Sequence, residues 1–368
     1  MGEMKKKILL FHGCLPPYRI DLFNSFADDF DLQAILMAKP IKLRALGFDA
    51  KAMETQAKFH FEWHNRGLYF GNHLISTIYG KVIRRLHPDI VWCQELGVNT
   101  LCAIFLKRFF KYKIMLGVDD SPAMLSCYSI LRRILRRFEY RHVDLILVVS
   151  REVKSVLQEK FTDCNFFYMP IIQDEKKFTL KLEDSVLIAN EYTAKYSLKD
   201  KVVFLFVGRM EKEKRPLFLL HAFMEANMTD AVLVFIGDGS LSQTISDIIV
   251  SHHLQKRVIQ TGKLQGEDLY AWYRVADYFV LPSEFEPFGS VVNEALLSGC
   301  KVIISDQVGA STLVNDANGT VFPYQDEGEL IRQMKAFAKI GKKQSTESLM
   351  DISFVKLYES LKETVEFL

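Results

Sequence analysis

The chain has 368 residues, of which 49% are apolar and 25% are charged, with 47 Lys and Arg against 45 Asp and Glu. That balance is typical of a soluble globular protein, and the length predicts two domains of ~150–200 residues each. The longest uninterrupted apolar runs, such as 145–149, are far too short to cross a bilayer, which excludes a transmembrane helix.

The start of the chain and its cysteines favour a reducing compartment. Basic residues open the chain as in a signal peptide, but only the short run 8–11 follows before His12 and Pro16-Pro17, so we interpret it as a strand. The cysteines show no C-x-x-C spacing, which argues against a zinc site or a disulfide framework. They are Cys14, Cys93, Cys102, Cys127, Cys164 and Cys300. The expected location is the cytoplasm.

Short β-rich runs alternate with helical stretches from Lys5 onward. In the first half the predicted strands are 7–11, 32–37, 89–93, 113–118, 144–149 and 166–169. This alternation predicts a parallel, doubly wound sheet.

A second alternating series follows a polar stretch, 181–201, whose weak periodicity suggests the domain junction. Its predicted strands are 202–207, 231–236, 257–260, 278–281 and 301–304, and its predicted helices are 216–225, 241–253, 266–275 and 290–298. The expected fold is therefore α/β, with two Rossmann-like doubly wound domains facing a central cleft. A ligand would bind at the carboxyl ends of their strands.

Three segments make up the expected domain organisation. Residues 1–178 form an N-terminal Rossmann-like domain, 179–349 form a C-terminal one, and 350–368 form a terminal helix. Phe354, Tyr358, Leu361 and Val365 follow helical spacing in that last segment. We expect this apolar stripe to pack back on the N-terminal domain.

A basic helix is predicted at 131–138. Its apolar residues Leu131, Ile134, Leu135 and Phe138 lie on one arc, and Arg132, Arg133, Arg136 and Arg137 lie on the opposite arc. Three interpretations remain open: attraction to an anionic membrane surface, attraction to a polyanionic substrate, or a solvated face whose Arg stems cover apolar surface. No DNA or RNA motif accompanies the charge, so we expect no nucleic acid partner.

The stretch 281–300 concentrates the most chemistry. It predicts a strand, a turn with Pro287 and Gly289, and then a helix, so that Glu286 lies in the turn and Glu294 inside the helix. The amides of Phe288, Gly289 and Ser290 fall at the helix N-terminus, where unpaired N–H groups and the helix dipole favour an anion. The alternative is a purely structural turn capped by Ser290.

Two glycine turns in the second domain follow predicted strands. Gly208 ends the strand at 202–207, Arg209 offers a planar fork for phosphate oxygens, and Lys214 follows at the next helix start. Gly237 ends the strand at 231–236 in the same way. These residues predict a diphosphate site, and the alternative is a plain basic loop.

Together these motifs resemble the retaining GT-B glycosyltransferases of family 4. The resemblance rests on Gly208-Arg209 with Lys214, on the glycine turn at 237–239, on Ala276-Asp277, and on Glu286 and Glu294, whose spacing matches that family's E-x7-E signature. It is strong across 202–325 and looser before that.

The resemblance implies a role for each matching residue. Arg209 and Lys214 would hold the diphosphate of a nucleotide sugar, and Glu294 would bond the ribose. Glu286 would contact the sugar beside the amides of Phe288 and Gly289. No cofactor and no metal are expected, because the cations and the helix amides take the charge of the leaving group.

The first domain departs from the family pattern. Where many members have a His-Asp pair after the fourth strand, this chain has Asp119 and Asp120, one of which we expect to act on the acceptor. Gly13, in the loop after the first strand, is expected to approach the donor phosphates.

The predicted function is transfer of a sugar from a nucleotide-diphosphate donor to a glycan or lipid-linked acceptor with retention of configuration, in cell-surface polysaccharide or glycolipid synthesis. The enzyme would be cytoplasmic, or peripheral at the inner face of the membrane. Two alternatives remain: a nucleotide-sugar epimerase of the same fold, and a non-catalytic protein that binds nucleotide sugars or glycans.

Overall fold

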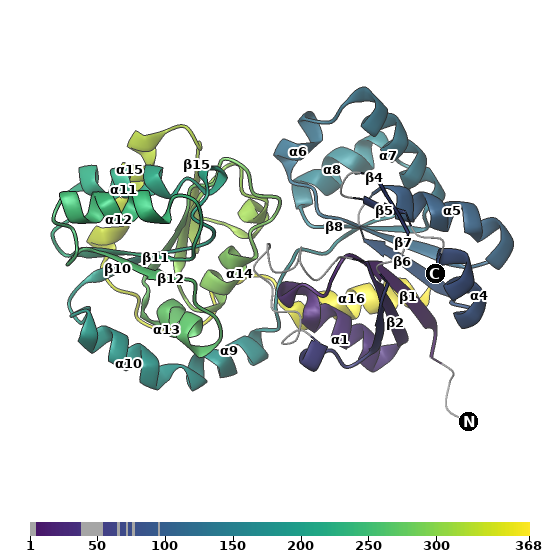
Figure 1. Cartoon of the computed structure of the whole chain (residues 1–368), viewed down its shortest axis with the longest axis horizontal. Helices are drawn as coiled ribbons and strands as arrows, with labels where there is room; N and C mark the ends of the chain where they lie inside the picture. Colours follow the sequence, from purple (N-terminus) through teal and green to yellow (C-terminus); the bar gives the residue numbers. More distant parts are fainter. Residues whose placement is uncertain (1–4, 38–53, 65–66, 71–72, 76–77, 95) are drawn as a thin grey trace. The chain divides into compact units, whose positions relative to one another are not determined.

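The computed structural model describes residues 5–37, 54–64, 67–70, 73–75, 78–94 and 96–368 (Figure 1). The chain forms two compact units. Unit 1 comprises Met1–Ile172 and Val355–Leu368, and unit 2 comprises Gln173–Phe354.

A seven-stranded parallel sheet forms the centre of unit 1. Its order is β3-β2-β1-β6-β7-β8-β9, and every strand pair in it is parallel. Its inner strands are mostly buried apolar runs, as expected for a sheet covered on both faces, whereas the edge strand β3 is only partly buried. Their bounds are β1 Lys7–His12, β2 Asp31–Leu36, β3 His60–Trp63, β6 Ile90–Gln94, β7 Lys113–Val118, β8 Leu145–Val148 and β9 Phe166–Tyr168.

The helices of unit 1 lie between these strands in the sequence, except for the C-terminal helix α16. They are η1 Pro17–Arg19, α1 Ile20–Asp29, α4 Ile78–Leu86, α5 Val98–Phe110, α6 Pro122–Ser126, α7 Ile130–His142, α8 Arg151–Lys160 and α16 Phe354–Glu366. A separate antiparallel pair is formed by β4 Leu68–Phe70 and β5 His73–Ile75.

The C-terminal helix α16 packs on α1 of unit 1. The hydroxyl of Tyr358 donates to the carbonyl of Ser25 and to the carboxylate of Asp29, each at 2.7 Å, and the ring of Tyr358 lies edge-on to Phe26. Lys362 pairs with the other oxygen of Asp29 at 2.7 Å. The apolar stripe of the helix is thereby buried at Leu361 and Val365.

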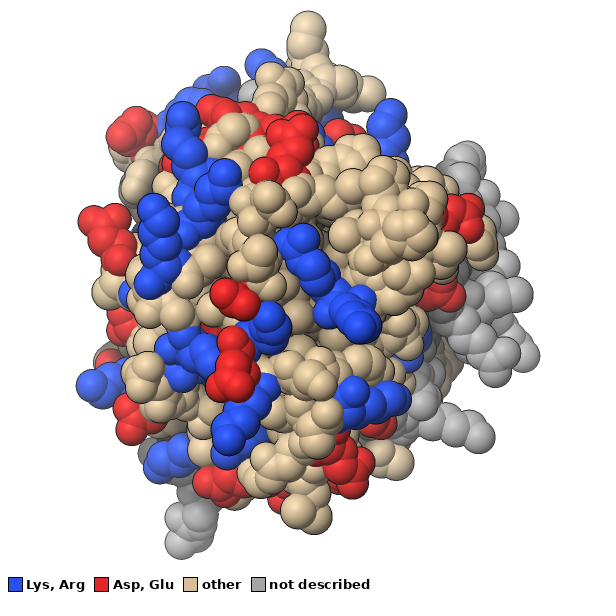
Figure 2. All heavy atoms as spheres, turned by 90° about the vertical axis from the view of Figure 1, so that its left-hand side faces the viewer, with Lys and Arg blue, Asp and Glu red and all other residues tan. Residues whose placement is uncertain are grey.

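Unit 2 has a six-stranded parallel sheet in the order β12-β11-β10-β13-β14-β15. The strands are β10 Val202–Val207, β11 Ala231–Ile236, β12 Val258–Gly262, β13 Tyr278–Leu281, β14 Lys301–Ser305 and β15 Gly319–Phe322. The helices are α9 Glu175–Asp184, α10 Val186–Lys195, η2 Lys212–Lys214, α11 Pro216–Ala226, α12 Ser242–Ser251, α13 Glu267–Val275, α14 Ser290–Leu297, η3 Gly309–Leu313 and α15 Glu327–Ile340. On the face of unit 2 that Figure 2 shows, Lys and Arg are interspersed with Asp and Glu.

Both sheets are parallel and doubly wound, which confirms the predicted α/β class with two Rossmann-like folds. Among the described residues, no helix has the length and the apolar composition needed to cross a membrane.

The polar stretch 181–201 is not a linker. Most of it lies in α9 and α10, whose buried side contacts α13: Phe178 packs edge-on against Tyr270, and Tyr192 stacks on Trp272 at 4.8 Å between ring centroids. The units divide between Ile172 and Gln173, ahead of the expected boundary after 178, because α9 packs within unit 2.

Helix α7 corrects the expectation for the arginine cluster. Arg136 is buried, not exposed: it forms an ion pair with Asp120 at 2.5 Å, and its guanidinium lies 3.7 Å from the centre of the Tyr128 ring. It is therefore unavailable to a membrane surface. Arg132 is exposed over the same ring, and Arg133 and Arg137 are exposed.

Candidate functional site

The chain order of unit 2 places its sequence motifs at a switch point of the sheet. From β10 the chain proceeds to β11 on one side, and it later returns through β13 to β14 on the other. In open α/β sheets this reversal leaves a crevice outside the carboxyl ends of the two central strands, where ligands bind. The loops that follow β10 and β13 contain Gly208, Arg209 and Lys214, and Glu286, respectively.

Lys214 and Glu286 form an ion pair that joins these two loops. The pair is largely shielded, because its side chains are only 12% and 15% exposed. The loops are also tied by their backbones, since the N–H of Glu284 donates to the carbonyl of Glu213 at 2.9 Å. The fold thus brings together two predicted site residues that lie far apart in the sequence.

Arg209 lies in the same loop but is far more exposed. Its guanidinium pairs with Glu213 at 2.8 Å. Surface pairs of this kind are worth little, so a phosphate could displace Glu213 at small cost.

Helix α14 begins at Ser290, with Gly289 at its N-cap position and no side-chain cap. The structure therefore gives no support to the alternative of a turn capped by the Ser290 hydroxyl. The N–H groups of a first helical turn have no acceptor within the helix, and they favour an anion. Gly289 has φ +89°, a left-handed conformation that few residues other than glycine adopt.

A tight approach of neighbouring loops holds this helix start in place. The carbonyl of Phe288 accepts from the N–H of Ala310 at 2.7 Å, and the carbonyl of Glu286 accepts from the N–H of Gly309 at 3.0 Å. A Cβ at Gly309 would clash with the carbonyl of Pro287. These contacts therefore hold in place the turn that presents the free amides at the start of α14.

Glu294 is oriented by two residues that the sequence analysis did not single out. Tyr273 donates its hydroxyl to one carboxylate oxygen at 2.9 Å, and Gln173 donates its amide to the other at 3.0 Å. The pKa of Glu294 is raised, because the effect of burial outweighs the two hydrogen bonds and the charge of Lys181, which lower it. The partners come from α13 and from the start of unit 2, so no local motif in the sequence could have revealed them.

Gly208 and Gly237 pack directly against each other. The N–H of Gly208 donates to the carbonyl of Ile236, and a Cβ on Gly237 would clash with the carbonyl of Gly208. Glu211 holds the next turn, because it accepts from the amide and the hydroxyl of Ser240 at 2.9 and 2.6 Å. Gly237 therefore has a structural reason to be glycine, apart from any contact with a ligand.

Unit 1 has its own polar cluster at the carboxyl ends of β1, β6 and β7. Arg19 is buried and pairs with Asp119, whose carboxylate also accepts from the amide of Gln94 at 3.1 Å. The ring of His12 lies nearby with its Nδ1 accepting from the N–H of Cys14. Burial, with a smaller contribution from Arg19, lowers the pKa of His12 to about 4, so His12 is neutral at pH 7.

The predicted residues of unit 1 divide between exposed and buried positions. Gly13 is exposed and has open space where a side chain would be. Asp119 is partly exposed, but Asp120 is buried between the hydroxyl of Tyr128 at 2.6 Å and Arg136. Asp120 therefore anchors α7, and Asp119 is the aspartate that lies with the polar cluster.

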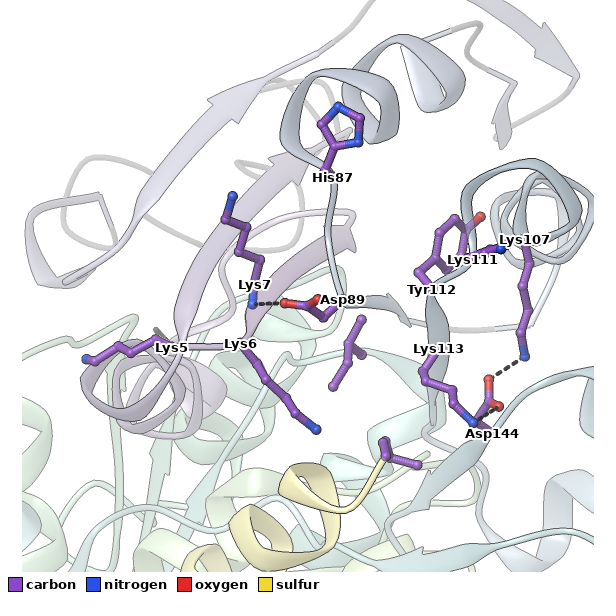
Figure 3. Close-up of a pocket in the computed structure, with 12 residues that line it drawn as sticks. Lys5, Lys6, Lys7, His87, Asp89, Lys107, Lys111, Tyr112, Lys113 and Asp144 are labelled. Atoms are coloured by element: carbon purple, nitrogen blue, oxygen red, sulfur yellow. Dashed lines mark hydrogen bonds and ion pairs between the residues drawn. The ribbon is translucent and has the colours of Figure 1, made fainter. Parts of the chain in front are cut away.

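A hollow of about 870 Å³ lies elsewhere, at the amino ends of β1, β6 and β7 in unit 1 (Figure 3). Lysines dominate its lining, but Lys107 and Lys113 both pair with Asp144 there. We place the candidate site at the carboxyl ends because ligands of parallel α/β sheets bind at that edge. In the described part of the chain, no group of three or more His, Cys, Asp or Glu is arranged to hold a metal ion.

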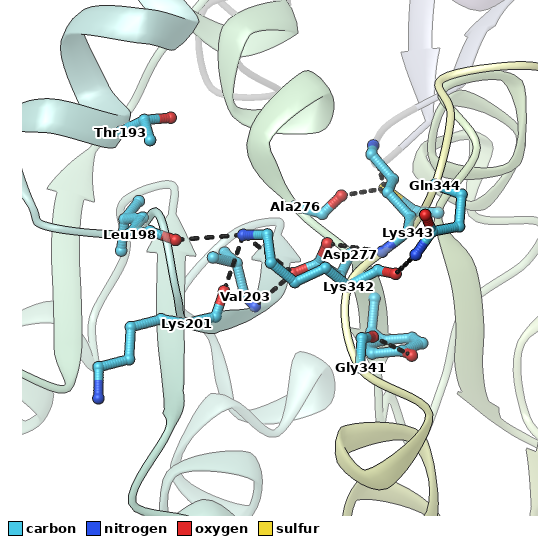
Figure 4. Close-up of polar contacts among 12 residues, drawn as sticks. Thr193, Leu198, Lys201, Val203, Ala276, Asp277, Gly341, Lys342, Lys343 and Gln344 are labelled. Carbon is cyan, nitrogen blue, oxygen red and sulfur yellow. Dashed lines mark hydrogen bonds and ion pairs between the residues drawn. The ribbon is translucent and has the colours of Figure 1, made fainter.

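The Ala276-Asp277 motif is part of the framework of unit 2 (Figure 4). One oxygen of Asp277 accepts from the N–H of Val203 at 2.8 Å, and the other accepts from the N–H of Lys343 at 2.9 Å. Lys343 in turn donates to the carbonyls of Tyr273 and Ser298, each at 2.9 Å. The motif thus fastens the segment after α15 to the start of β10.

The larger part of unit 2 matches a known protein family. Residues 189–347 match the model of the family described as Glycosyl transferases group 1. An uncharacterized glycosyltransferase of Methanocaldococcus jannaschii is 25% identical over 243 residues, covering 61% of this chain and 57% of that protein. The N-acetylgalactosamine-N,N'-diacetylbacillosaminyl-diphospho-undecaprenol 4-alpha-N-acetylgalactosaminyltransferase of Campylobacter jejuni is 25% identical over 263 residues, covering 66% of this chain and 68% of that enzyme.

The fold comparison extends over the whole chain. The crystal structure of Anabaena HepE in complex with UDP aligns with a TM-score of 0.75 at 16% identity, covering 98% of this chain and 100% of that one. Residues 189–347 therefore match the glycosyl transferases group 1 family, and the chain as a whole has the fold of GT-B glycosyltransferases.

Proposed function

We propose that the protein is a glycosyltransferase that moves a sugar from a nucleoside-diphosphate donor to the hydroxyl of a glycan or lipid-linked acceptor, with retention of configuration. The observation that carries the proposal is the shielded Lys214–Glu286 pair at the switch point of unit 2, beside the first turn of α14. The family match and the UDP in the structure of HepE support the donor class.

The pair suits a nucleotide-sugar donor because Lys214 and Glu286 would bind different parts of the donor. A diphosphate is a stronger partner for the Lys214 ammonium than a single carboxylate, since it offers several anionic oxygens. Once Lys214 has turned to the diphosphate, Glu286 is left with a carboxylate that accepts hydrogen bonds from sugar hydroxyls. Glu294, oriented by Tyr273 and Gln173, would accept from the ribose hydroxyls in the same way.

The chemistry would break the bond from the anomeric carbon to the diphosphate oxygen and form a bond to the acceptor oxygen, whose proton would pass to the departing diphosphate. Negative charge develops on the departing diphosphate, and Lys214, Arg209 and the amides at α14 are the groups that would stabilise it. We propose on this ground that no metal ion is needed. The synthesis of surface polysaccharide or glycolipid on the cytoplasmic side of the membrane is the role that we propose for such an enzyme.

Two measurements test the proposal. A panel of nucleotide sugars is screened for slow hydrolysis in the presence of EDTA, and nucleoside diphosphates are titrated calorimetrically. We expect one donor to be hydrolysed and its diphosphate to bind. Release of an isomeric nucleotide sugar would instead indicate an epimerase, and binding without turnover on any donor or acceptor would indicate a binding protein.

A further inference from the structure

Helices α5 and α7 of unit 1 expose an unusual amount of apolar side chain. Of the fourteen large apolar residues that are exposed in the described part of the chain, six lie on these two helices. They are Phe105, Phe109, Ile130, Leu131, Ile134 and Phe138, which we call the α5–α7 patch. The two helices contact each other, because they connect successive strands of one parallel sheet on the same face.

The exposure of the patch is built into the way α7 packs. A soluble amphipathic helix normally buries its apolar arc, but α7 buries Arg136, Glu139 and Tyr140. Arg136 pairs with Asp120, and Glu139 accepts from the N–H of Gly97 at 2.8 Å, at the start of α5. These buried polar contacts fix the rotation of α7 about its axis, so its apolar arc has to point away from the sheet.

The charge on the two helices has a single sign. Neither sequence contains an acidic residue except Glu139, which is fully buried. The exposed charged residues that flank the patch are Arg108, Arg132, Arg133, Arg137 and Arg141. This differs from the mixed charge of the face in Figure 2.

We infer that the α5–α7 patch docks unit 1 on the surface of an anionic lipid bilayer. Apolar side chains would enter the boundary between headgroups and acyl chains, and the arginines would lie at the level of the lipid phosphates. A second copy of the chain is a poorer occupant, because pairing the patch with itself would bring two sets of arginines together. The inference is independent of the proposed transfer activity, since it concerns binding to lipid alone.

The test is co-sedimentation of the full chain with phosphatidylcholine vesicles that contain or lack phosphatidylglycerol. We expect binding only to the anionic vesicles, and we expect added salt to weaken it. The double variant Leu131→Ser/Ile134→Ser should lower the partition coefficient at least about tenfold, because two apolar side chains no longer leave water. Arg133→Gln/Arg137→Gln should lower it roughly thirtyfold, at about 1 kcal/mol per cation.

Matched controls come from unit 2. Leu131 and Ile134 are 77% and 61% exposed, and Leu187 and Leu180 are 75% and 59% exposed, so Leu187→Ser/Leu180→Ser removes similar apolar surface elsewhere. Lys335→Gln/Lys339→Gln on α15 is the charge control. Both controls should bind vesicles like the parent chain, and circular dichroism of all variants checks folding.

A second measurement reports the depth of the patch directly. A Leu131→Trp variant should show fluorescence that shifts to shorter wavelength on anionic vesicles and is quenched by brominated lipid. The inference is overturned if the parent chain ignores anionic vesicles, or if the Leu131 and Leu187 variants lose binding equally. It is also overturned if the patch variants abolish self-association while vesicle binding is absent throughout.

Discussion

The carboxyl ends of the central strands carry charged residues in both units, but the two sets are built differently. In unit 2 the Lys214–Glu286 pair joins two short loops beside a helix start, and Arg209 remains largely exposed. In unit 1 Arg19 is buried against Asp119, and His12 beside them is neutral. The edge of unit 2 thus has cations that can exchange partners, which suits a polyanion. The edge of unit 1 is internally neutralised, which suits an uncharged hydroxyl compound.

The largest expected effect concerns Lys214, the cation of unit 2 that can exchange one anionic partner for another. Lys214→Ala should lower transfer about 100- to 1,000-fold, because one charged contact to the developing negative charge is lost. The matched control is Lys212→Ala, an exposed lysine of the same 3-10 helix. Steady-state turnover on the identified donor and acceptor measures both. Near-normal turnover of the Lys214 variant would show that the donor site lies elsewhere.

Much of the fold of both units could be predicted from the sequence. Most strands of both sheets could be predicted because they are continuous apolar runs that alternate with helical spacing, as at 202–207 and 231–236. The donor-side residues could be singled out because each lies within a few residues of a strand end or helix start. The short strands β3, with the sequence His-Phe-Glu-Trp, and β15, which begins at Gly319, lack such an apolar run and were not predicted.

The cluster of unit 1 could not be predicted in the same way. His12, Arg19, Gln94 and Asp119 lie at or just after the ends of three different strands, and only the strand order brings them together. The rotation of α7 was also hidden, because its periodicity is equally compatible with either arc facing the sheet. Buried partners such as Asp120 decide between them, and their position depends on the tertiary fold.

A smaller expected effect tests the neutral histidine of unit 1. The pKa of His12 falls from 6.5 to about 4 on folding, so protons bind more tightly to the unfolded chain. The contribution of His12 to the free energy of unfolding is therefore fully present above pH 6.5. It is lost as the pH falls toward 4, by up to about 3 kcal/mol. In His12→Asn, the free energy of unfolding measured with urea should lose much of its dependence on pH across this range. The exposed His221 provides the control, since His221→Asn should leave the profile unchanged.

The next smaller expected effect concerns the ion pair in which Asp119 neutralises Arg19. Asp119→Asn keeps the shape of the side chain but leaves a buried guanidinium without its counter-charge. We expect the free energy of unfolding to fall by about 2 kcal/mol, less than for a fully buried pair because Asp119 is partly exposed. Asp230→Asn breaks the exposed pair with Lys201 and should lower the free energy of unfolding far less, because solvent screens that pair. Equal costs for the two variants would contradict the contrast between the units.

The smallest expected effect concerns the orientation of Glu294. Tyr273→Phe removes one hydrogen bond to the carboxylate and should weaken nucleoside-diphosphate binding about fivefold, equivalent to ~1 kcal/mol. Tyr278→Phe removes a hydroxyl that bonds the carbonyl of Gly341 instead, so it should not change binding. Calorimetric titration of both variants measures the difference, and an unaltered affinity in Tyr273→Phe would show that Tyr273 does not orient Glu294 for donor binding.

The division of the chain has a consequence for synthesis on the ribosome. Unit 2 is inserted into unit 1, because Val355–Leu368 returns to the unit in which the chain began. Domains generally fold as they emerge, but Phe26 and Asp29 must wait for Tyr358 and Lys362 before their contacts form. Unit 2 can therefore complete its fold first, and the unit that is translated first is the one that finishes last.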